Sequence, residues 1–190
     1  MLEQMTGRLK VKQNLEGVLK TVLDDVIALH GAEFGAIQLL DQETLLIVGE
    51  QGLGRNFVLP FGQVTKDDVS ACGRALLHRK PIVIPDVDKD ELFQPYLPIL
   101  KQLGFRAVQS TPLITLDGEL IGVVTTQFAK PHEPTVIEMK TIVEYAPVAA
   151  GFIKKFMQPT DARRLYDALC RDCERAPRND TSSSRSEIRI

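Results

Sequence analysis

Little in this sequence points to export, membrane insertion or disulfide bonding. No stretch approaches the roughly 18 apolar residues that a membrane-spanning helix needs, and the N-terminus lacks the apolar segment of a signal peptide. The chain has three cysteines, an odd number in a sequence without an export signal, which argues against a disulfide framework. We therefore expect a cytoplasmic protein with no membrane attachment.

An excess of positive charge is also missing. Lysine and arginine total 23 against 25 for aspartate and glutamate, so the net charge is −2 and the pI is about 5.9. Nothing here favours a nucleic-acid partner, because such proteins carry clustered basic charge. With 190 residues, 44% of them hydrophobic and 25% charged, the composition is typical of one globular domain with extensions.

Apolar spacing predicts a long helix near each end of the chain and strands between them. Helical periodicity covers residues 9–30, before Gly31 as a helix stop, and returns over residues 135–157. Four apolar strands are expected as two hairpins, residues 34–40 with 44–50 and residues 107–115 with 119–128.

The middle of the chain is predicted to be less regular. Glycines and prolines mark a loop over residues 52–62, and a helix over 67–79 and a short strand over 81–85 follow. Residues 86–103 are expected to form short, irregular helices. Because the strands come as hairpins and are apolar on both faces, we expect an α+β domain whose central antiparallel sheet is covered by helices on each face.

Three stretches of the sequence carry a family resemblance. They are residues 72–76 (CGRAL) with 80–87 (KPIVIPDV), residues 104–113 (GFRAVQSTPL) and residues 117–124 (DGELIGVV). Together they resemble the GAF domains of bacterial two-component sensor histidine kinases, over roughly residues 15–155. The resemblance implies a GAF/PAS-like sheet with the terminal helices on one face and a ligand pocket under the middle helices on the other.

The sequence divides into three parts, and the resemblance implies a regulatory role for the first of them. Residues 1–158 would be the GAF sensor domain, residues 159–175 a short C-terminal helix and residues 176–190 a disordered tail. A small molecule would bind the pocket and shift the balance between helix arrangements, without catalysis. The terminal helices would then act on a histidine kinase or another signalling protein, and their wide apolar stripes favour a homodimer.

The ligand is not identified by these motifs, and no cofactor or metal is indicated. The signature of the cyclic-nucleotide members cannot be placed in this sequence. The motif that accompanies the bilin-anchoring cysteine is missing, and Cys72 lies inside a predicted helix.

Polar side chains on the strand over residues 107–115 are the first ligand-binding candidates. Gln109 and Thr111 share one face of this strand, where polar groups cost free energy unless they are hydrogen-bonded. A bound ligand would supply those bonds, so we expect Gln109, Thr111 and Thr126 of the neighbouring strand to face the pocket. Arg106 either clamps an anion at the pocket mouth or pairs with the acids of residues 86–91.

The remaining candidates lie on the segments expected to roof the pocket. Asp86 either contacts the ligand or caps the helix that follows it. Phe93 and Tyr96 either line the cavity or belong to the core. Cys72, on an apolar helix face, is either an inert buried thiol or a pocket residue.

Two other functions are kept as alternatives. The first is a ligand-free module that dimerises or docks a partner kinase, and the second is a thiol-dependent reductase on the same fold. Cys170 and Cys173 form a Cys-x-x-Cys pair that supplies half of a tetrahedral zinc site. The three histidines, His30, His78 and His132, lie near the ends of predicted elements, where we expect them to be solvated.

Overall fold

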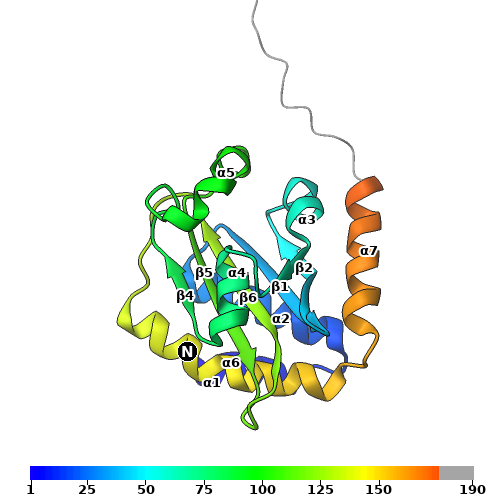
Figure 1. Ribbon diagram of the computed structural model, residues 1–190. Coiled ribbons are helices and arrows are strands. Elements are labelled where there is room, and N and C mark those ends of the chain that lie inside the picture. The colour runs from blue at the N-terminus through cyan, green and yellow to red at the C-terminus, as the bar shows by residue number, and fades with distance from the viewer. Residues whose placement is uncertain (176–190) are drawn as a thin grey trace, which may run out of the picture.

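A six-stranded antiparallel sheet forms the centre of the computed structural model, which describes residues 1–175 (Figure 1). Both predicted hairpins are present. They form one sheet because β1 of the first hairpin pairs with β6 of the second. The strand order is β3-β2-β1-β6-β5-β4. The strands are β1 (Phe34–Asp41), β2 (Thr44–Gln51), β3 (Gln63–Thr65), β4 (Ile82–Ile84), β5 (Ala107–Ile114) and β6 (Leu120–Phe128).

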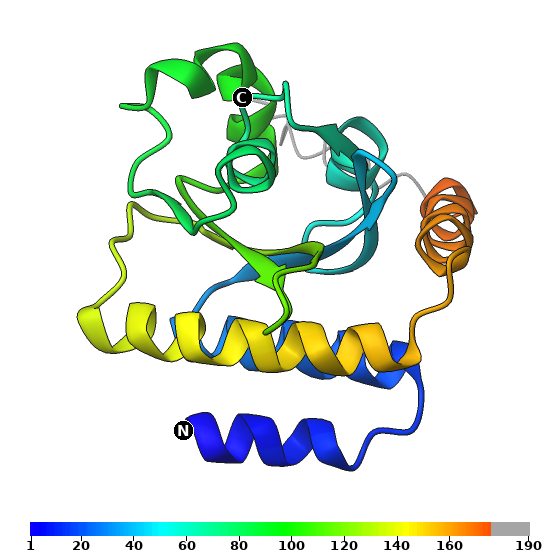
Figure 2. The ribbon, with the colours of Figure 1, turned by 60° about the horizontal axis from the view of Figure 1, so that its bottom comes forward.

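Two long helices cover one face of the sheet, as the sequence predicted. They are α2 (Leu15–His30) and α6 (Val136–Phe156), and they lie side by side beneath the strands in Figure 2. Gly31 ends α2 in the left-handed conformation with φ of 60°, which a residue without a Cβ adopts freely. A capping box begins α6: the Thr135 side chain accepts a hydrogen bond from the Glu138 amide, and the Glu138 side chain accepts one from the Thr135 amide. The largest apolar cluster of the molecule fills the space between these helices and the sheet.

The predicted first helix over residues 9–30 is wrong at its start, because the chain breaks there into two helices. A separate α1 (Leu2–Lys10) ends before Val11, which is 73% exposed. The Asn14 side chain then accepts a hydrogen bond from the Gly17 amide at 2.8 Å and begins α2. The apolar spacing runs through this break, so periodicity alone could not reveal it.

Helix α1 packs on the outer side of α2 and α6, away from the sheet (Figure 2). Its Arg8 forms an ion pair with Asp25, a carboxylate of α2 that is 1% exposed. The Tyr145 hydroxyl of α6 donates to the same carboxylate at 2.7 Å. Burial raises the pKa of Asp25, and the bonds from Tyr145 and Arg8 act against that rise. Helix α1 therefore covers part of the apolar stripe that the sequence analysis assigned to a homodimer.

Four shorter helices cover the opposite face. They are α3 (Arg55–Phe61), α4 (Ala71–His78), the 3-10 helix η1 (Glu91–Tyr96) and α5 (Leu97–Leu103). The irregular helices predicted over residues 86–103 are confirmed as η1 and α5. The loop predicted over residues 52–62 is wrong, because it contains α3 and leads directly into strand β3. Pro95 lies inside η1 and removes a backbone donor there, whereas Pro98 lies in the first turn of α5, where a proline is tolerated.

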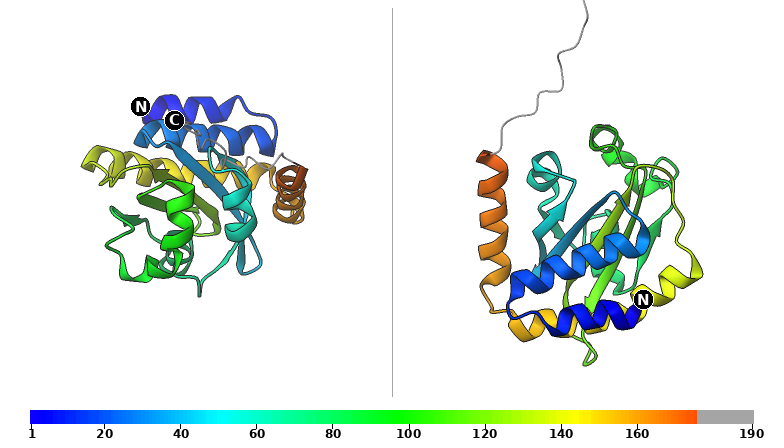
Figure 3. Two further views of the ribbon diagram at one scale, coloured as in Figure 1. Left: turned by 90° about the horizontal axis from the view of Figure 1, so that it is seen from above. Right: turned by 180° about the vertical axis from the view of Figure 1, so that it is seen from behind.

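The last described helix, α7 (Asp161–Arg175), lies outside strand β2 and helix α3, as both views of Figure 3 show. Its Cys173 is 7% exposed and packs with Ile47 and Val58. The Tyr166 hydroxyl accepts a hydrogen bond from the Gln63 side chain at 3.2 Å. The tail predicted over residues 176–190 lies outside the described residues.

Candidate functional site: a roofed cavity on the sheet

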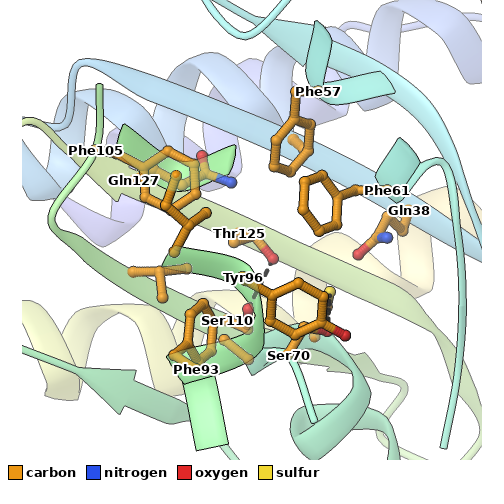
Figure 4. A pocket seen from close by; sticks show the side chains of 15 residues that line it. Gln38, Phe57, Phe61, Ser70, Phe93, Tyr96, Phe105, Ser110, Thr125 and Gln127 are labelled. Carbon is orange, nitrogen blue, oxygen red and sulfur yellow. Dashed lines mark hydrogen bonds between the residues drawn. The ribbon is translucent and has the colours of Figure 1, made fainter. Parts of the chain in front are cut away.

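A small cavity of about 40 Å³ lies between the sheet and the middle helices (Figure 4). Its floor comes from β1, β5 and β6, and its roof comes from α3, α4, η1 and α5. On the same measure, one buried water needs about 10–15 Å³, so the space fits a few water-sized groups. A larger molecule would need the roof to move outwards.

The floor of the cavity is polar although it is deeply buried. The hydroxyls of Ser110 and Thr125 are 2.9 Å apart across β5 and β6. Gln38 of β1 and Gln127 of β6 flank this pair, and their side chains point into the cavity (Figure 4). All four residues are at most 4% exposed.

Aromatic rings form most of the roof. Phe57 and Phe61 come from α3, Phe93 and Tyr96 from η1, and Phe105 from the loop before β5. Ring centroids are 5.6 Å apart for Phe61 and Tyr96 and 5.8 Å apart for Phe93 and Tyr96, both edge to face. Such pairs favour this tilted geometry, so ring contacts hold α3 and η1 together over the cavity.

One polar bond ties the roof to the segment before α4. The Tyr96 hydroxyl donates to Asp68 Oδ2 at 3.1 Å. Burial, with the neighbouring Asp68 carboxylate as the second cause, raises the pKa of Tyr96 to about 12. Tyr96 therefore stays protonated at neutral pH and keeps this bond.

The structure places Phe93, Tyr96 and Cys72 on the cavity wall. The Cys72 thiol lies 3.2 Å from the Ser70 hydroxyl, and Ser70 also caps α4 by accepting from the Gly73 amide. Burial raises the pKa of Cys72, and the bond to Ser70 only partly opposes this. Because the thiolate is the reactive form, Cys72 is poorly placed to act as a nucleophile.

We predict that iodoacetamide will modify Cys72 of the folded protein at pH 7.5 more than about tenfold more slowly than free cysteine. Peptide mass mapping after timed quenching measures this rate, and the same reaction in urea gives the rate of the unfolded chain. Modification as fast as free cysteine would contradict the burial argument and restore the reductase alternative.

The prediction that Gln109, Thr111 and Thr126 face the pocket is corrected by the structure, which turns them to the helix-covered face. Gln109 Nε2 lies 3.4 Å from His30 Nε2 and 3.6 Å from Met139 Sδ of α6. Thr126 Oγ1 lies 3.0 Å from His30 Nδ1. Alternation along a strand correctly predicts which residues share a face, but not which layer that face meets.

His30 is buried rather than solvated as predicted. It ends α2, is 4% exposed and is bonded to strands β5 and β6 through Gln109 and Thr126. Burial lowers the pKa of His30 to about 4, with Glu138 opposing the shift and His132 adding to it. His132 is also not free in solvent, because its ring stacks on Phe128 at a centroid distance of 3.9 Å.

Asp86 and Arg106 lie outside the cavity and pair with each other. Arg106 donates to Asp86 at 2.8 Å and also contacts Asp88 at 3.1 Å. The Arg106 bond lowers the pKa of Asp86. Asp90, rather than Asp86, caps the following helix by accepting from the amides of Leu92 and Phe93. Of the two roles considered for Arg106, the structure shows the ion pair with the acids of residues 86–91 and not a contact at the mouth of the cavity.

Sequence reasoning missed most of the cavity wall. The floor residues of β5 and β6 were not recognised because the cavity was assigned to the opposite face of these two strands. No face was assigned to the strand that carries Gln38, and the segment of α3 looked like a loop. No alternating signal marked the floor, because polar side chains occupy consecutive positions in β5 (residues 109–111) and in β6 (residues 125–127) and so lie on both faces of the sheet. The missed residues include Gln38, Ser110, Thr125, Gln127, Phe57 and Phe61.

Within residues 1–175, no group of three or more His, Cys, Asp or Glu side chains converges to hold a metal ion. Among the same residues, no helix combines the length and apolar character needed to cross a membrane.

The antiparallel sheet, with terminal helices on one face and a roofed cavity on the other, defines an α+β domain. The chain belongs to the GAF domain family, whose model matches residues 12–154. GAF domains act in general as sensory and regulatory domains in signalling. The match ends before α7, so that helix lies beyond the family's shared core.

Solved structures share this fold at low sequence identity. A domain of a candidate two-component sensor histidine kinase from Sinorhizobium meliloti 1021 is 22% identical, with a TM-score of 0.63 over 80% of this chain and 99% of that one. The GAF domain of a phosphoenolpyruvate-protein phosphotransferase from Coxiella burnetii is 22% identical, with a TM-score of 0.67 over 81% and 90%.

One similar structure is an enzyme. The free methionine-R-sulfoxide reductase from Neisseria meningitidis, solved in complex with its substrate, is 16% identical, with a TM-score of 0.62 over 86% of this chain and 88% of that one. At these sequence identities, the similarity to the three solved structures shows a shared fold and nothing about a shared activity. No curated protein matches the sequence.

Proposed function

We propose that this GAF domain is a non-catalytic sensor that holds a small molecule in the roofed cavity and acts on a partner signalling protein through its terminal helices. The observation that carries the proposal is the buried polar floor, where the carboxamide oxygens of Gln38 and Gln127 have no hydrogen-bond partner among the described residues. Buried polar groups are normally satisfied, so a binding site explains them.

The roof supplies a movable part. Helix α3 has seven residues and η1 has six, and their rings meet each other over the cavity. A molecule larger than a few waters fits only when these rings move outwards. The ligand would then favour an open arrangement by its higher affinity for it, which is a shift of population.

The sheet gives this shift a route to the terminal helices. Thr125 faces the cavity, whereas the next residue, Thr126, contacts His30 at the end of α2. Ser110 faces the cavity, and its neighbour Gln109 contacts Met139 of α6. A displaced floor would therefore move groups that hold α2 and α6.

A homodimer is part of the proposal, with α6 as its surface. Val136, Ile137 and Val143 are 85%, 72% and 51% exposed on this helix, although α1 covers its other side. Contact between the same surface of two copies would bury them. A histidine kinase or another signalling protein would read the helix arrangement.

The two alternatives have less support. A ligand-free docking module does not need unpaired carboxamide groups inside a cavity, because those groups reduce its stability. A thiol reductase would need a reactive cysteine, yet Cys72 is the one cysteine that lines the cavity and burial raises its pKa. Cys173 packs with Ile47 and Val58 instead.

Native mass spectrometry of the freshly purified protein tests the proposal. We expect a dimer that carries additional non-covalent mass. Ala36→Leu, which adds bulk to the cavity wall, should remove that mass, whereas Ala129→Leu adds the same bulk at an exposed site and should keep it. Circular dichroism confirms that both variants fold.

Other results of that experiment would change the conclusion. A dimer without added mass, even after incubation with cell extract, would favour the docking module. A monomer would remove the dimer from the mechanism. Added mass that survives in Ala36→Leu would place the ligand outside this cavity.

A further inference from the structure

The two carboxamide oxygens on the cavity floor indicate what kind of group a ligand must present. Gln38 and Gln127 are 2% and 1% exposed, and neither oxygen has a donor among the described residues. A carboxamide oxygen can only accept a hydrogen bond. The missing partner is therefore a donor, such as an N–H group.

The positions of these amides define two ends of a site. Ala36 of β1 lies opposite Thr125 of β6, and Gln38 and Gln127 each follow two residues later in strands that run in opposite directions. The two amides therefore lie on either side of Thr125, as Figure 4 shows. A ligand that meets both must donate in two separate directions.

The cavity excludes charged ligands. None of the fifteen lining residues is charged, and the Asp68 carboxylate, in the segment before α4, is bonded to the Tyr96 hydroxyl. A phosphate or carboxylate would be buried without a counterion, and burying an unpaired charge is far more costly than burying a neutral group. The site therefore suits an uncharged molecule.

The shape of the site favours a flat molecule. Five aromatic rings form the roof, and the sheet forms a floor facing them (Figure 4). Planar groups gain most from the faces and edges of aromatic rings.

We propose that the cavity takes an uncharged, planar heterocycle whose N–H groups donate to the carboxamide oxygens of Gln38 and Gln127. This assignment rests on the proposed sensor function and narrows its ligand. It excludes nucleotides, because their phosphate would meet no cation among the lining residues.

Three probes test the ligand class by calorimetry on the full chain. Benzimidazolone is neutral and planar with two N–H donors, its N,N′-dimethyl derivative keeps the ring but lacks the donors, and adenosine monophosphate adds a phosphate. We expect benzimidazolone to bind at least about tenfold more tightly than the dimethyl derivative, a difference of about 1.4 kcal/mol. Adenosine monophosphate should not bind.

Substitution of the glutamines by methionine gives a second readout with the opposite sign. Gln38→Met and Gln127→Met should each weaken benzimidazolone binding about tenfold, because the acceptor is lost. Without a probe, each should raise the unfolding midpoint by about 2–4 °C, because an unpaired buried group is removed. Gln109→Met is the control, since its unpaired oxygen lies on the other sheet face, and it should leave probe binding unchanged.

The outcomes separate the two proposals. If adenosine monophosphate binds, or if both floor variants bind benzimidazolone like the wild type, the ligand class is wrong and the sensor function stands. If no probe binds, the molecule that the protein retains in native mass spectrometry decides whether the proposed ligand class is right. An uncharged heterocycle with N–H groups would support that class, and any other molecule would overturn it. No probe binding and no retained mass would reject the sensor function itself.

Discussion

Replacing Gly122 by alanine will lower the free energy of unfolding by about 3–5 kcal/mol, in the range of the most damaging single substitutions. Gly122 lies in the central strand β6, where it pairs with Leu39 of β1 and Leu113 of β5. A Cβ at this position would overlap the carbonyl oxygen of Gln38 and approach Leu39 Cα within 3.1 Å. Both obstacles are backbone atoms of a paired strand, so no side-chain rotation relieves them.

Urea unfolding followed by circular dichroism measures this loss. Gly151→Ala is the matched control, because its added Cβ has no atom within 4 Å on the exposed side of α6. That control should be more stable than the wild type by up to about 1 kcal/mol, since alanine favours a helix over glycine. If Gly122→Ala is as stable as the wild type, β1 and β6 do not pair as described.

The second large effect is a loss of stability in acid that depends on His30. In the neutral ring, Nδ1 donates to Thr126 Oγ1 and Nε2 accepts from the Gln109 amide. Protonation would place a second N–H against the Gln109 donor inside the core. Burial, which disfavours the charged ring, is the main cause of the fall in the pKa of His30 from 6.5 to about 4, with Glu138 opposing the shift and His132 adding to it.

The sign of the pH effect follows from the difference in bound protons. Between pH 6.5 and pH 4 the unfolded chain binds the His30 proton and the folded chain does not, so the stability rises with pH. The full contribution is present above pH 6.5, and about 3 kcal/mol is lost as the pH falls to 4.

Urea unfolding at several pH values checks this prediction against two variants. His30→Asn keeps an amide donor for Thr126 without a titrating ring, so its stability should fall less between pH 6.5 and pH 4 than that of the wild type. His78→Asn alters a histidine at the exposed end of α4 and should follow the wild type. Equal slopes for all three proteins would show that His30 does not titrate as described.

These predictions concern two features of one sheet. Gly122 permits the close approach of β1 and β6, which together carry Gln38, Thr125 and Gln127 on the cavity side. His30 joins the other side of β5 and β6 to the end of α2. The sheet is thus shared between the cavity and the helices that the proposed signal would reach.

Most secondary structure could be predicted because local signals were strong. The two hairpins, the short strand β4 and the helices α2 and α6 follow from apolar periodicity and turn residues. Helix α3 was missed because glycines and Pro60 suggested a loop. The break before Asn14 was missed because the apolar pattern continues through it.

The candidate site was harder to predict than the fold. Phe93, Tyr96 and Cys72 do line the cavity, whereas Gln109, Thr111 and Thr126 face the helices and Asp86 and Arg106 pair outside. Strand β5 is buried on both faces, so burial along the sequence could not distinguish the cavity side from the helix side.

The sequence by itself determined the order of most elements, the pairing of the two hairpins and the sets of residues that share a strand face. These depend on interactions between near neighbours and on a period of two along each strand. Only the tertiary structure decided which set meets the cavity, that His30 is buried and that α1 covers the terminal helices. Each of these depends on how separate layers pack, and packing is set by contacts between segments far apart in the chain.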